Sequence, residues 1–445
     1  MHKKYYGPQT ELAINNFPFD FRKTHREFLR AIIEIKKAAA MGHTAARELD
    51  RDRERAIVAA CDELLAGKHD DQFPLPSFQG GAGTSNHMNV NEVIGNRATE
   101  ILATPSSPRL RRVDALRVHP NDHVNMSHST NDVMPSAAKI AAFRLAVEVD
   151  RSCEGLARAF EKKAKEHANV QKLGRTHMQD AVPTTFGAEC ASYAATIRRR
   201  QEGLRQARAV LLELNLGGSA IGNSINNSPT YLKALYVALP KVTKLPLKPA
   251  KNMMSQTGSV TDFLVVSQAL TALAADLSKI AGDFRILGSG PKGGFGEVIL
   301  PELQAGSSIM PGKVNPVLPE ALSQLYYLVS GNNLTIEHGC AGGQLELDVM
   351  MPVITDRIVE SLKLSAEMIK QFADKCVSIM QADRKKMKEH LENSTAFSTL
   401  LNPRLGYDAV STCVKEAIKS GKTLREVVIA KKLLTEKEFD HMTKF

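Results

Sequence analysis

The chain has 445 residues, more than one compact core usually holds, so two or three domains or one very elongated domain are expected. Apolar residues make up 43% of it, aromatic residues only 5%, and tryptophan is absent, which favours helices packed through aliphatic side chains. The net charge is +10, but the charges are interspersed without an aromatic–basic surface, which argues against a nucleic-acid partner.

Nothing in the sequence indicates a membrane or an oxidising compartment. No run of 18 apolar residues occurs, and residues 1–8 lack the apolar segment of a signal peptide. The six cysteines are scattered without a close pair, which indicates free thiols. We therefore expect a cytoplasmic protein with no membrane partner.

The first third of the chain is predicted to mix helices and loops. Residues 5–21 are rich in glycine, proline and asparagine and are predicted to form an irregular arm. A helix is expected after Thr24, which could cap it, because apolar residues then recur three to four apart. A second helix is predicted over residues 50–66, and loops over residues 73–84 and 104–124.

Long helical patterns follow Pro135, over residues 136–169, 187–214, 259–288, 317–338 and 352–382. The third carries an unbroken heptad seam, formed by Phe263, Val266, Leu270, Leu273, Leu277, Ile280, Phe284 and Leu287. Helices of about 36–40 Å, at roughly 1.5 Å per residue, pack lengthwise in bundles. Because five helices of one chain bury only part of their faces on each other, we expect further burial between subunits.

The pattern becomes shorter near Arg384. A short strand or hairpin is predicted within residues 242–251, and a final helix within 433–445, capped by Thr435. The predicted fold is all-α with three domains: a mostly helical N-terminal domain, a central long-helix bundle that carries most site motifs, and a small helical C-terminal domain. Their ranges are 1–124, 125–383 and 384–445.

The segment at residues 305–320 is the strongest candidate for a functional loop. Its prolines and glycines disfavour helix and strand, whereas Ser307, Ser308, Lys313 and Asn315 gather hydroxyl, ammonium and amide groups. Such a loop can close over a ligand, and Lys313 indicates that this ligand is an anion. Ordinary surface loops share this composition.

Three further polar clusters interrupt the apolar pattern, at residues 79–92, 119–132 and 174–181. The first is glycine-rich but lacks the Lys-Ser/Thr ending and the preceding strand of a phosphate-binding loop. The second precedes a long helix, where free backbone N–H groups attract anions, although a plain N-cap gives the same pattern.

Two other chemistries fit the residue types less well. A metal site is a minor alternative, because Pro120 argues against a helix that would bring His119 and His123 together. A serine hydrolase would need a glycine two positions after Ser307 and a strand leading into it, and the sequence has neither.

The four clusters resemble the motifs of the aspartase/fumarase superfamily. The matching runs are GGAGTS at 80–85, SHSTND at 127–132, GRTHMQDA at 174–181 and GSSIMPGKVNP at 306–316. The resemblance covers nearly the whole chain. It implies an all-α homotetramer in which the bundles of four subunits pack together and three chains form each active site. It implies no metal and no organic cofactor.

Members of this family eliminate a group next to a carboxylate-activated carbon and release fumarate. Residues 80–85 and 317–320 resemble the aspartase forms, whereas the run at 119–122 also occurs in fumarases. The expected reaction on a small dicarboxylate is release of ammonia from L-aspartate. The alternatives are class II fumarate hydratase, or a related lyase acting on another amino or hydroxy dicarboxylate.

The resemblance also implies roles for individual residues. Ser307 would be the base and His177 a second catalytic group, paired with Glu320. The substrate would be held by Thr84, Ser129, Thr130 and Ser308 at the activated carboxylate, by Lys313, Asn315 and Thr176 at the other, and by Asn131 and His177 at the amino group.

Four positions depart from the family pattern. His87 stands where the family usually has asparagine, His128 replaces a glutamine, Asp348 an asparagine and Asn223 a threonine. The position of His87 lies beside the substrate in relatives, so His87 is assigned to substrate binding, and an altered substrate is an alternative. A neutral histidine still donates one hydrogen bond.

Overall fold

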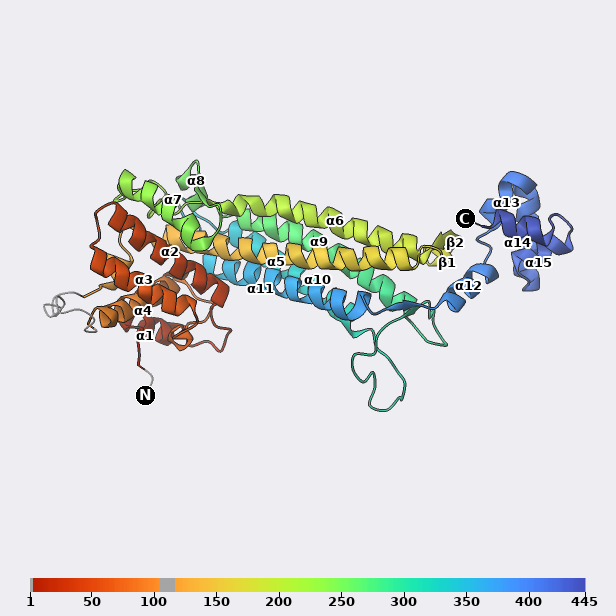
Figure 1. Cartoon of the computed structure of the whole chain (residues 1–445), viewed down its shortest axis with the longest axis horizontal. Coiled ribbons are helices and arrows are strands. Elements are labelled where there is room, and N and C mark those ends of the chain that lie inside the picture. Colours follow the sequence, from red (N-terminus) through yellow and green to blue (C-terminus); the bar gives the residue numbers. More distant parts are fainter. Residues whose placement is uncertain (1–2, 104–116, 445) are drawn as a thin grey trace. The chain divides into compact units, whose positions relative to one another are not determined.

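The computed structural model describes residues 3–103 and 117–444 (Figure 1). Helices dominate, and the strands in the described residues form three two-stranded pairs, so the predicted all-α class is confirmed. Much of the loop predicted at 104–124 lies outside the described residues.

Contacts divide the chain into two compact units. Unit 1 contains residues 1–150, 202–272 and 327–366, and unit 2 contains residues 151–201, 273–326 and 367–445. Five long helices contribute residues to both: α5 (Thr130–Glu166), α6 (Phe186–Arg208), α9 (Asp262–Leu287), α10 (Val317–Cys340) and α11 (Met351–Phe372). The division into three domains stays a prediction.

Unit 1 is built around α2, which packs against α3 and α7, while α3 also packs against α4 (Figure 1). Its other elements are α1 (Pro8–Asn16), α2 (Arg26–Ala45), α3 (Arg51–Leu65), α4 (Thr84–Ala103), α7 (Pro229–Thr243), α8 (Met253–Gly258), and the parallel pair β3 (Glu213–Leu214) and β4 (Lys248–Pro249). The strand or hairpin predicted at 242–251 is therefore only β4.

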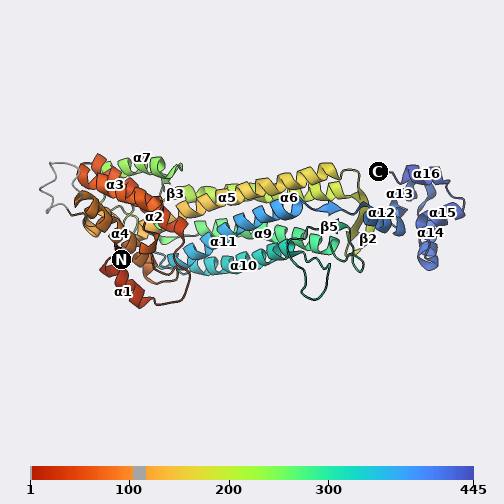
Figure 2. The ribbon, with the colours of Figure 1, turned by 60° about the horizontal axis from the view of Figure 1, so that its bottom comes forward.

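Unit 2 holds two antiparallel strand pairs and the C-terminal helices (Figure 2). The elements are β1 (Gln171–Thr176), β2 (Gln179–Thr185), β5 (Val298–Ile299), β6 (Gln381–Ala382), α12 (Arg384–Asn393), α13 (Ser398–Leu405), α14 (Tyr407–Ser420), α15 (Leu424–Ala430) and α16 (Glu436–Met442). Thr435 caps α16 in a capping box, as predicted. Phe160, Tyr193 and Phe284 form an aromatic cluster with ring centroids 5.5–5.8 Å apart.

The predicted seam of α9 is buried along its whole length. By length and composition alone, α9 is also apolar enough to cross a membrane, which is weak evidence because core helices pass the same test. Less than half of its most apolar stretch, 44%, is buried within the chain. That exposure is what a helix that packs on other subunits would show, so intersubunit burial stays the prediction.

The irregular arm predicted at residues 5–21 is wrong, because Pro8–Asn16 form α1. Pro8 occupies the first helical position, where its fixed φ fits and its missing N–H is not needed. Glu92 of α4 accepts hydrogen bonds from the backbone N–H groups of Gly7, Gln9 and Thr10 at 2.8, 2.8 and 3.2 Å. The cap of α1 therefore comes from a residue more than 80 positions away in the chain.

Two other local predictions are also corrected. Pro120 does not prevent a helix but begins a π-helical turn, Pro120–Val124, and the His119 side chain caps it by accepting from Asn121 and Asp122 N–H groups. Thr24 does not cap α2, since the N-cap is His25. The Thr24 hydroxyl lies instead 3.0 Å from Asn86 Oδ1.

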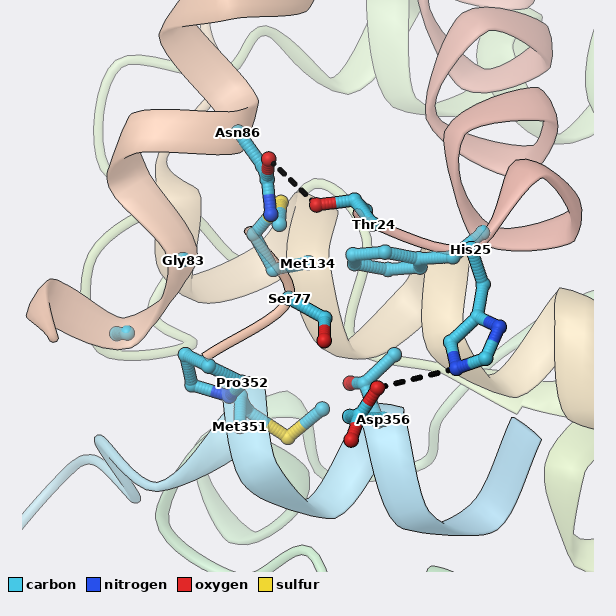
Figure 3. Close-up of a pocket in the computed structure, with 12 residues that line it drawn as sticks. Thr24, His25, Ser77, Gly83, Asn86, Met134, Met351, Pro352 and Asp356 are labelled. Carbon is cyan, nitrogen blue, oxygen red and sulfur yellow. Dashed lines mark hydrogen bonds and ion pairs between the residues drawn. The ribbon is translucent and has the colours of Figure 1, made fainter. Parts of the chain in front are cut away.

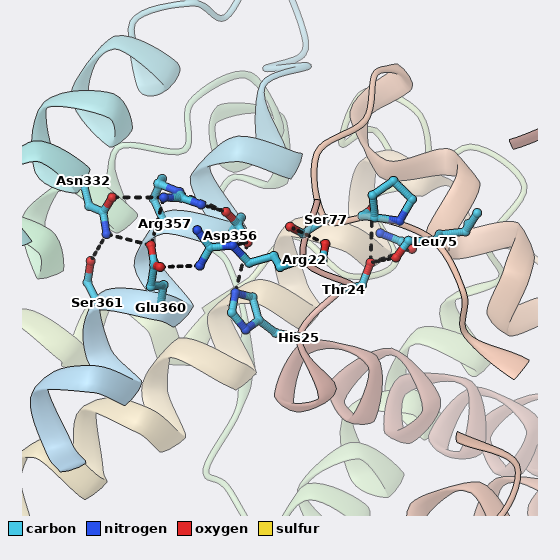
Figure 4. A network of polar contacts seen from close by, with 12 residues as sticks. Arg22, Thr24, His25, Leu75, Ser77, Asn332, Asp356, Arg357, Glu360 and Ser361 are labelled. Carbon is cyan, nitrogen blue, oxygen red and sulfur yellow. Dashed lines mark hydrogen bonds and ion pairs between the residues drawn. The ribbon is translucent and has the colours of Figure 1, made fainter. Parts of the chain in front are cut away.

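A buried carboxylate ties α11 to the segment before α2 (Figure 4). Asp356 Oδ1 lies 3.0 Å from His25 Nε2, and its Oδ2 accepts from Arg357 Nε at 2.9 Å. Arg22 pairs with Asp356 and with Glu360. Burial alone would raise the pKa of Asp356, but the hydrogen bonds from His25 and Arg357 outweigh it and lower the pKa to about 2.

We predict that Asp356→Asn lowers the free energy of unfolding by about 3 kcal/mol, because it removes the buried carboxylate charge that the half-buried Arg22 and Arg357 pair with. The loss should be full above about pH 4 and fade as the pH falls towards 2, since the native carboxylate is held ionised. Denaturant unfolding at several pH values measures it. Asp374→Asn, at an exposed pair with Lys370, is the control and should change stability by less than about 1 kcal/mol. Equal effects would contradict the assignment.

Candidate active site

The loop before α10 folds back on itself and holds Ser307 at its base. Ser307 Oγ accepts hydrogen bonds from the backbone N–H groups of Ile309 and Met310 at 3.2 and 3.1 Å. Asn315 Nδ2 donates to Gly306 O at 2.8 Å, which closes the loop. Two donors on one hydroxyl oxygen stabilise negative charge there, although short serine turns have the same geometry.

The rest of the loop is exposed. The side chain of Ile309 is 82% exposed and that of Met310 48%, and both flank the serine. Ser308 and Lys313 are exposed as well, while Glu320 lies in the first turn of α10 and is partly buried. Apolar side chains in such positions are covered when a loop closes or another chain packs on it.

Thr176 and His177 lie at the tip of the β1–β2 hairpin, which the sequence did not predict. His177 and Met178 form its two-residue turn and both have positive φ, 54° and 60°. Such turns usually carry Asn-Gly or Asp-Gly, so this sequence gave no hairpin signal. The turn exposes Thr176 and His177 on unit 2.

Ser129 precedes α5, and Thr130 and Asn131 form its first turn, so this polar cluster lies at the start of a long helix as predicted. The Asn131 backbone N–H donates to Ser129 Oγ at 3.2 Å, and its side chain donates to Ala220 O at 2.8 Å. Asp132 is buried and accepts N–H groups of Ser129, Gly217 and Ser219 at 2.9–3.1 Å. Burial raises the pKa of Asp132 to about 6, despite these bonds.

The start of α4 contributes a histidine beside Thr130. His87 is buried, and its Nδ1 lies 3.0 Å from Thr130 Oγ1. Burial and then the charge of Lys36 lower the pKa of His87 well below its usual value, so the ring is neutral. Its Nε2 is buried without a hydrogen-bond partner. Thr84 is exposed, and its hydroxyl donates to Gly81 O at 2.7 Å.

A small pocket lies behind Gly83, between the starts of α2, α4 and α11 (Figure 3). It is lined by Thr24, His25, Phe28, Ser77, Ala82, Gly83, Asn86, Met134, Met351, Pro352, Thr355 and Asp356. None of the predicted site residues lines it. The pocket therefore lies beside the start of α4 and is distinct from the predicted site.

Within unit 1 the structure brings His87 and Thr130 into contact and places Ser129 and Asn131 beside them in the chain. In unit 2, no hydrogen bond or ion pair between described residues joins the Ser307 loop to Thr176 or His177.

The sequence missed two buried charged groups near the start of α5 in unit 1, Lys36 and Asp132. Lys36 gave one signal, since it falls four residues after Ile32, on the apolar stripe of its helix.

The departures at Asp348 and Asn223 lie in loops. Asp348 is buried, and its Oδ1 accepts from the Met350 N–H at 2.8 Å while Oδ2 has no hydrogen-bond partner. Burial raises its pKa. Asn223 is exposed and accepts from the Ile225 N–H at 3.2 Å.

In the described part of the chain, histidines, cysteines and carboxylates form no group of three or more that could hold a metal ion.

Comparison with known proteins gives one consistent result. A family model described as lyase matches residues 2–331, and one described as the fumarase C C-terminus matches residues 398–445. Aspartate ammonia-lyase of Bacillus subtilis is 41% identical over 436 residues, covering 98% of this chain and 90% of that protein.

Two solved structures are similar over the whole chain. Fumarate lyase:delta crystallin from Brucella melitensis bound to cobalt has a TM-score of 0.93 and 41% identity, covering 100% of this chain and 95% of that one. Class II fumarase from Schistosoma mansoni has a TM-score of 0.91 and 34% identity, with the same coverage.

We predict that Gly306→Ala opens the loop. A Cβ at Gly306 would overlap Lys313 O, so the two segments must separate. Overpacking of this kind costs about 1–3 kcal/mol, which favours the open form roughly 5- to 150-fold. Trypsin should then cut faster after the exposed Lys313. Gly293→Ala, where a Cβ meets nothing within 4 Å, is the control and should leave this rate unchanged.

Proposed function

The chain belongs to the aspartase/fumarase family of lyases, and on that premise we propose that it releases ammonia from L-aspartate to form fumarate. Aspartate ammonia-lyases, with about 40% identity over nearly the full length, support a carbon–nitrogen lyase. The observation that carries the proposal is the pair of backbone N–H groups aimed at Ser307 Oγ, because they favour the alkoxide that the reaction needs.

The chemistry requires stabilisation of a dianion. The proton to be removed lies on the carbon beside a carboxylate, and taking it leaves an aci-carboxylate that no side-chain base reaches unaided. Ser307 takes this proton, and the electron pair moves into the carboxylate. When the pair returns to form the carbon–carbon double bond, the carbon–nitrogen bond breaks and ammonia leaves.

Hydroxyl donors provide that stabilisation. Thr84, Ser129, Thr130 and Ser308 bind the carboxylate on which charge develops, and each such donor contributes roughly 3–4 kcal/mol. Lys313, Asn315 and Thr176 bind the other carboxylate. Asn131 and His177 face the amino group, and Glu320 orients His177. The residues supply this chemistry through hydrogen bonds and one ammonium charge.

We infer that the working protein is a homotetramer whose active sites combine residues of three chains. Exposed apolar side chains support this, since Tyr327 and Leu334 on α10 are 64% and 55% exposed and Leu345 is 92% exposed. The exposed Ile309 beside Ser307 fits the same arrangement. The hydroxyl-rich start of α5 in one chain would then meet the Ser307 loop of another.

A fumarate hydratase acting on L-malate is the second candidate. It is favoured by the 34% identity to a class II fumarase and by the run at residues 119–122, which fumarases share. The two candidates differ only in the leaving group, so the groups beside the amino or hydroxyl position decide between them.

The decisive experiment compares L-aspartate and L-malate with the purified full chain. We expect ultraviolet absorbance of fumarate to rise with L-aspartate, with one ammonia released per fumarate. Fumarate from L-malate alone would assign the hydratase. Inactivity on both would direct attention to His87 and to another amino or hydroxy dicarboxylate.

We predict that Ser307→Ala lowers kcat by roughly 10²–10⁴-fold or more, the usual contribution of a general base. Helix content by circular dichroism should not change, because Ser307 lies in a loop outside the packed core. Ser420→Ala, an exposed serine bonded to a carbonyl of its own helix, is the control. Turnover of Ser307→Ala close to that of the unmodified chain would rule out this base.

A further inference from the structure

A buried lysine that the proposed mechanism does not use lies behind the start of α5. Lys36 of α2 is 1% exposed. Its neighbour Lys37 lies on the outer side of the same helix and pairs with Asp62 at the surface. A buried ammonium is costly unless hydrogen bonds and nearby charges compensate it, so its position calls for a reason.

Lys36 holds both ends of the turn that leads into α5. Its Nζ donates to Asn125 Oδ1 at 2.7 Å and lies 3.1 Å from His128 Nδ1. The His128 N–H closes this turn on Asn125 O at 3.1 Å, and Ser127 within it has a φ of 62°. The turn therefore contains one residue in the left-handed region, and the Lys36 amine links its two ends. His43 also contacts the turn, with its Nε2 3.1 Å from Met126 O. Ser129 and Thr130 follow it directly.

His128 fits this role as a neutral ring. Because Nδ1 accepts from the Lys36 ammonium, the hydrogen lies on Nε2, which is 2.9 Å from the Tyr231 hydroxyl. Tyr231 is buried and its ring stacks on His43 at 3.7 Å. Burial and the Lys36 charge lower the pKa of His128 well below its usual value, which keeps Nδ1 free to accept.

One carboxylate offsets the Lys36 charge. Burial lowers the pKa of Lys36 to about 7, against the attraction of Asp132. The other titratable groups that interact electrostatically with Lys36 are Cys61, His43, His87 and His128. Burial lowers the pKa of each histidine and raises that of the thiol, so Asp132 is the anion that faces Lys36 within the described residues. An added carboxylate at the start of α5 would strengthen the charged form.

We propose that Lys36 is a positioning residue that acts through Asn125 and His128 on Ser129 and Thr130, and that its buried charge attracts the substrate carboxylate bound there. This inference rests on the proposed function, because it takes the start of α5 as the carboxylate site. It carries a thermodynamic consequence. If binding an anion stabilises the ammonium, binding takes up a proton at slightly alkaline pH, and affinity falls as the pH rises above about 7.

The test uses succinate, a dicarboxylate that cannot eliminate, with the purified full chain. Isothermal titration calorimetry at pH 7 to 8.5, in buffers of different ionisation enthalpy, measures affinity and proton uptake together. We expect proton uptake by the unmodified chain. Lys36→Met should bind succinate about tenfold more weakly at pH 7, without proton uptake. Lys37→Met is the matched control from the outer side of the same helix and should behave as the unmodified chain.

Two variants at the acceptor keep the test informative if Lys36→Met does not fold. His128→Gln still offers an oxygen to Lys36, so affinity and proton uptake should be retained. His128→Leu removes the acceptor and should weaken succinate binding severalfold. Circular dichroism verifies folding of each variant. Unchanged proton uptake in Lys36→Met, succinate binding by His128→Leu equal to that of the unmodified chain, or no succinate binding by the unmodified chain, would overturn the inference.

The outcome separates this inference from the proposed function. Fumarate formation from L-aspartate together with unchanged succinate binding in Lys36→Met would leave the function standing and remove the role of Lys36. Absence of turnover on L-aspartate together with Lys36-dependent succinate binding would remove the proposed function and leave the role of Lys36 standing.

Discussion

Helix ends govern where chemistry is possible in this molecule. The long helices bury apolar seams along their length, and their free backbone donors lie at the ends, where a helix starts or the chain turns. Thr84 begins α4, Thr130 begins α5, His177 forms a hairpin turn, and Ser307 lies in the loop before α10. The proposed reaction needs many hydrogen-bond donors around one anion. A helical scaffold can supply them by bringing several such ends together.

The sequence predicted those features that depend on local periodicity. The α9 seam and the five long helices follow from apolar spacing, and their boundaries differ from prediction by several residues where short turns follow, as after Arg208 and Phe372. The features it missed depend on distant residues. Glu92 caps α1 from another helix, and the hairpin turn at His177 has positive φ without the usual asparagine or glycine.

The candidate site shows the same division. Its hydroxyls and Lys313 were predicted because they lie in long motifs that resemble a known family. Lys36 was not predicted, although it lies on the apolar stripe of α2. Two adjacent lysines look alike in a sequence, whereas packing makes Lys36 an interior cation and leaves Lys37 partly exposed in an ion pair. The contact of His87 with Thr130 was also hidden, although His87 had been assigned to the site. Spacing identifies the face of a helix that is buried, but not which donor meets which acceptor there.

The cap of α1 by Glu92 has a consequence for how the chain is made. The first residues leave the ribosome early, but the carboxylate that completes their helix is synthesised more than 80 residues later. Until then α1 has no partner for its N-terminal amides, and a short isolated helix is marginal in water. The N-terminal segment therefore remains unfolded at first. It packs against α4, the helix that carries Thr84 and His87, after that helix has been synthesised. Removing this segment would leave Glu92, at the middle of α4, without these partners and would loosen from a distance the helix proposed to bind a carboxylate.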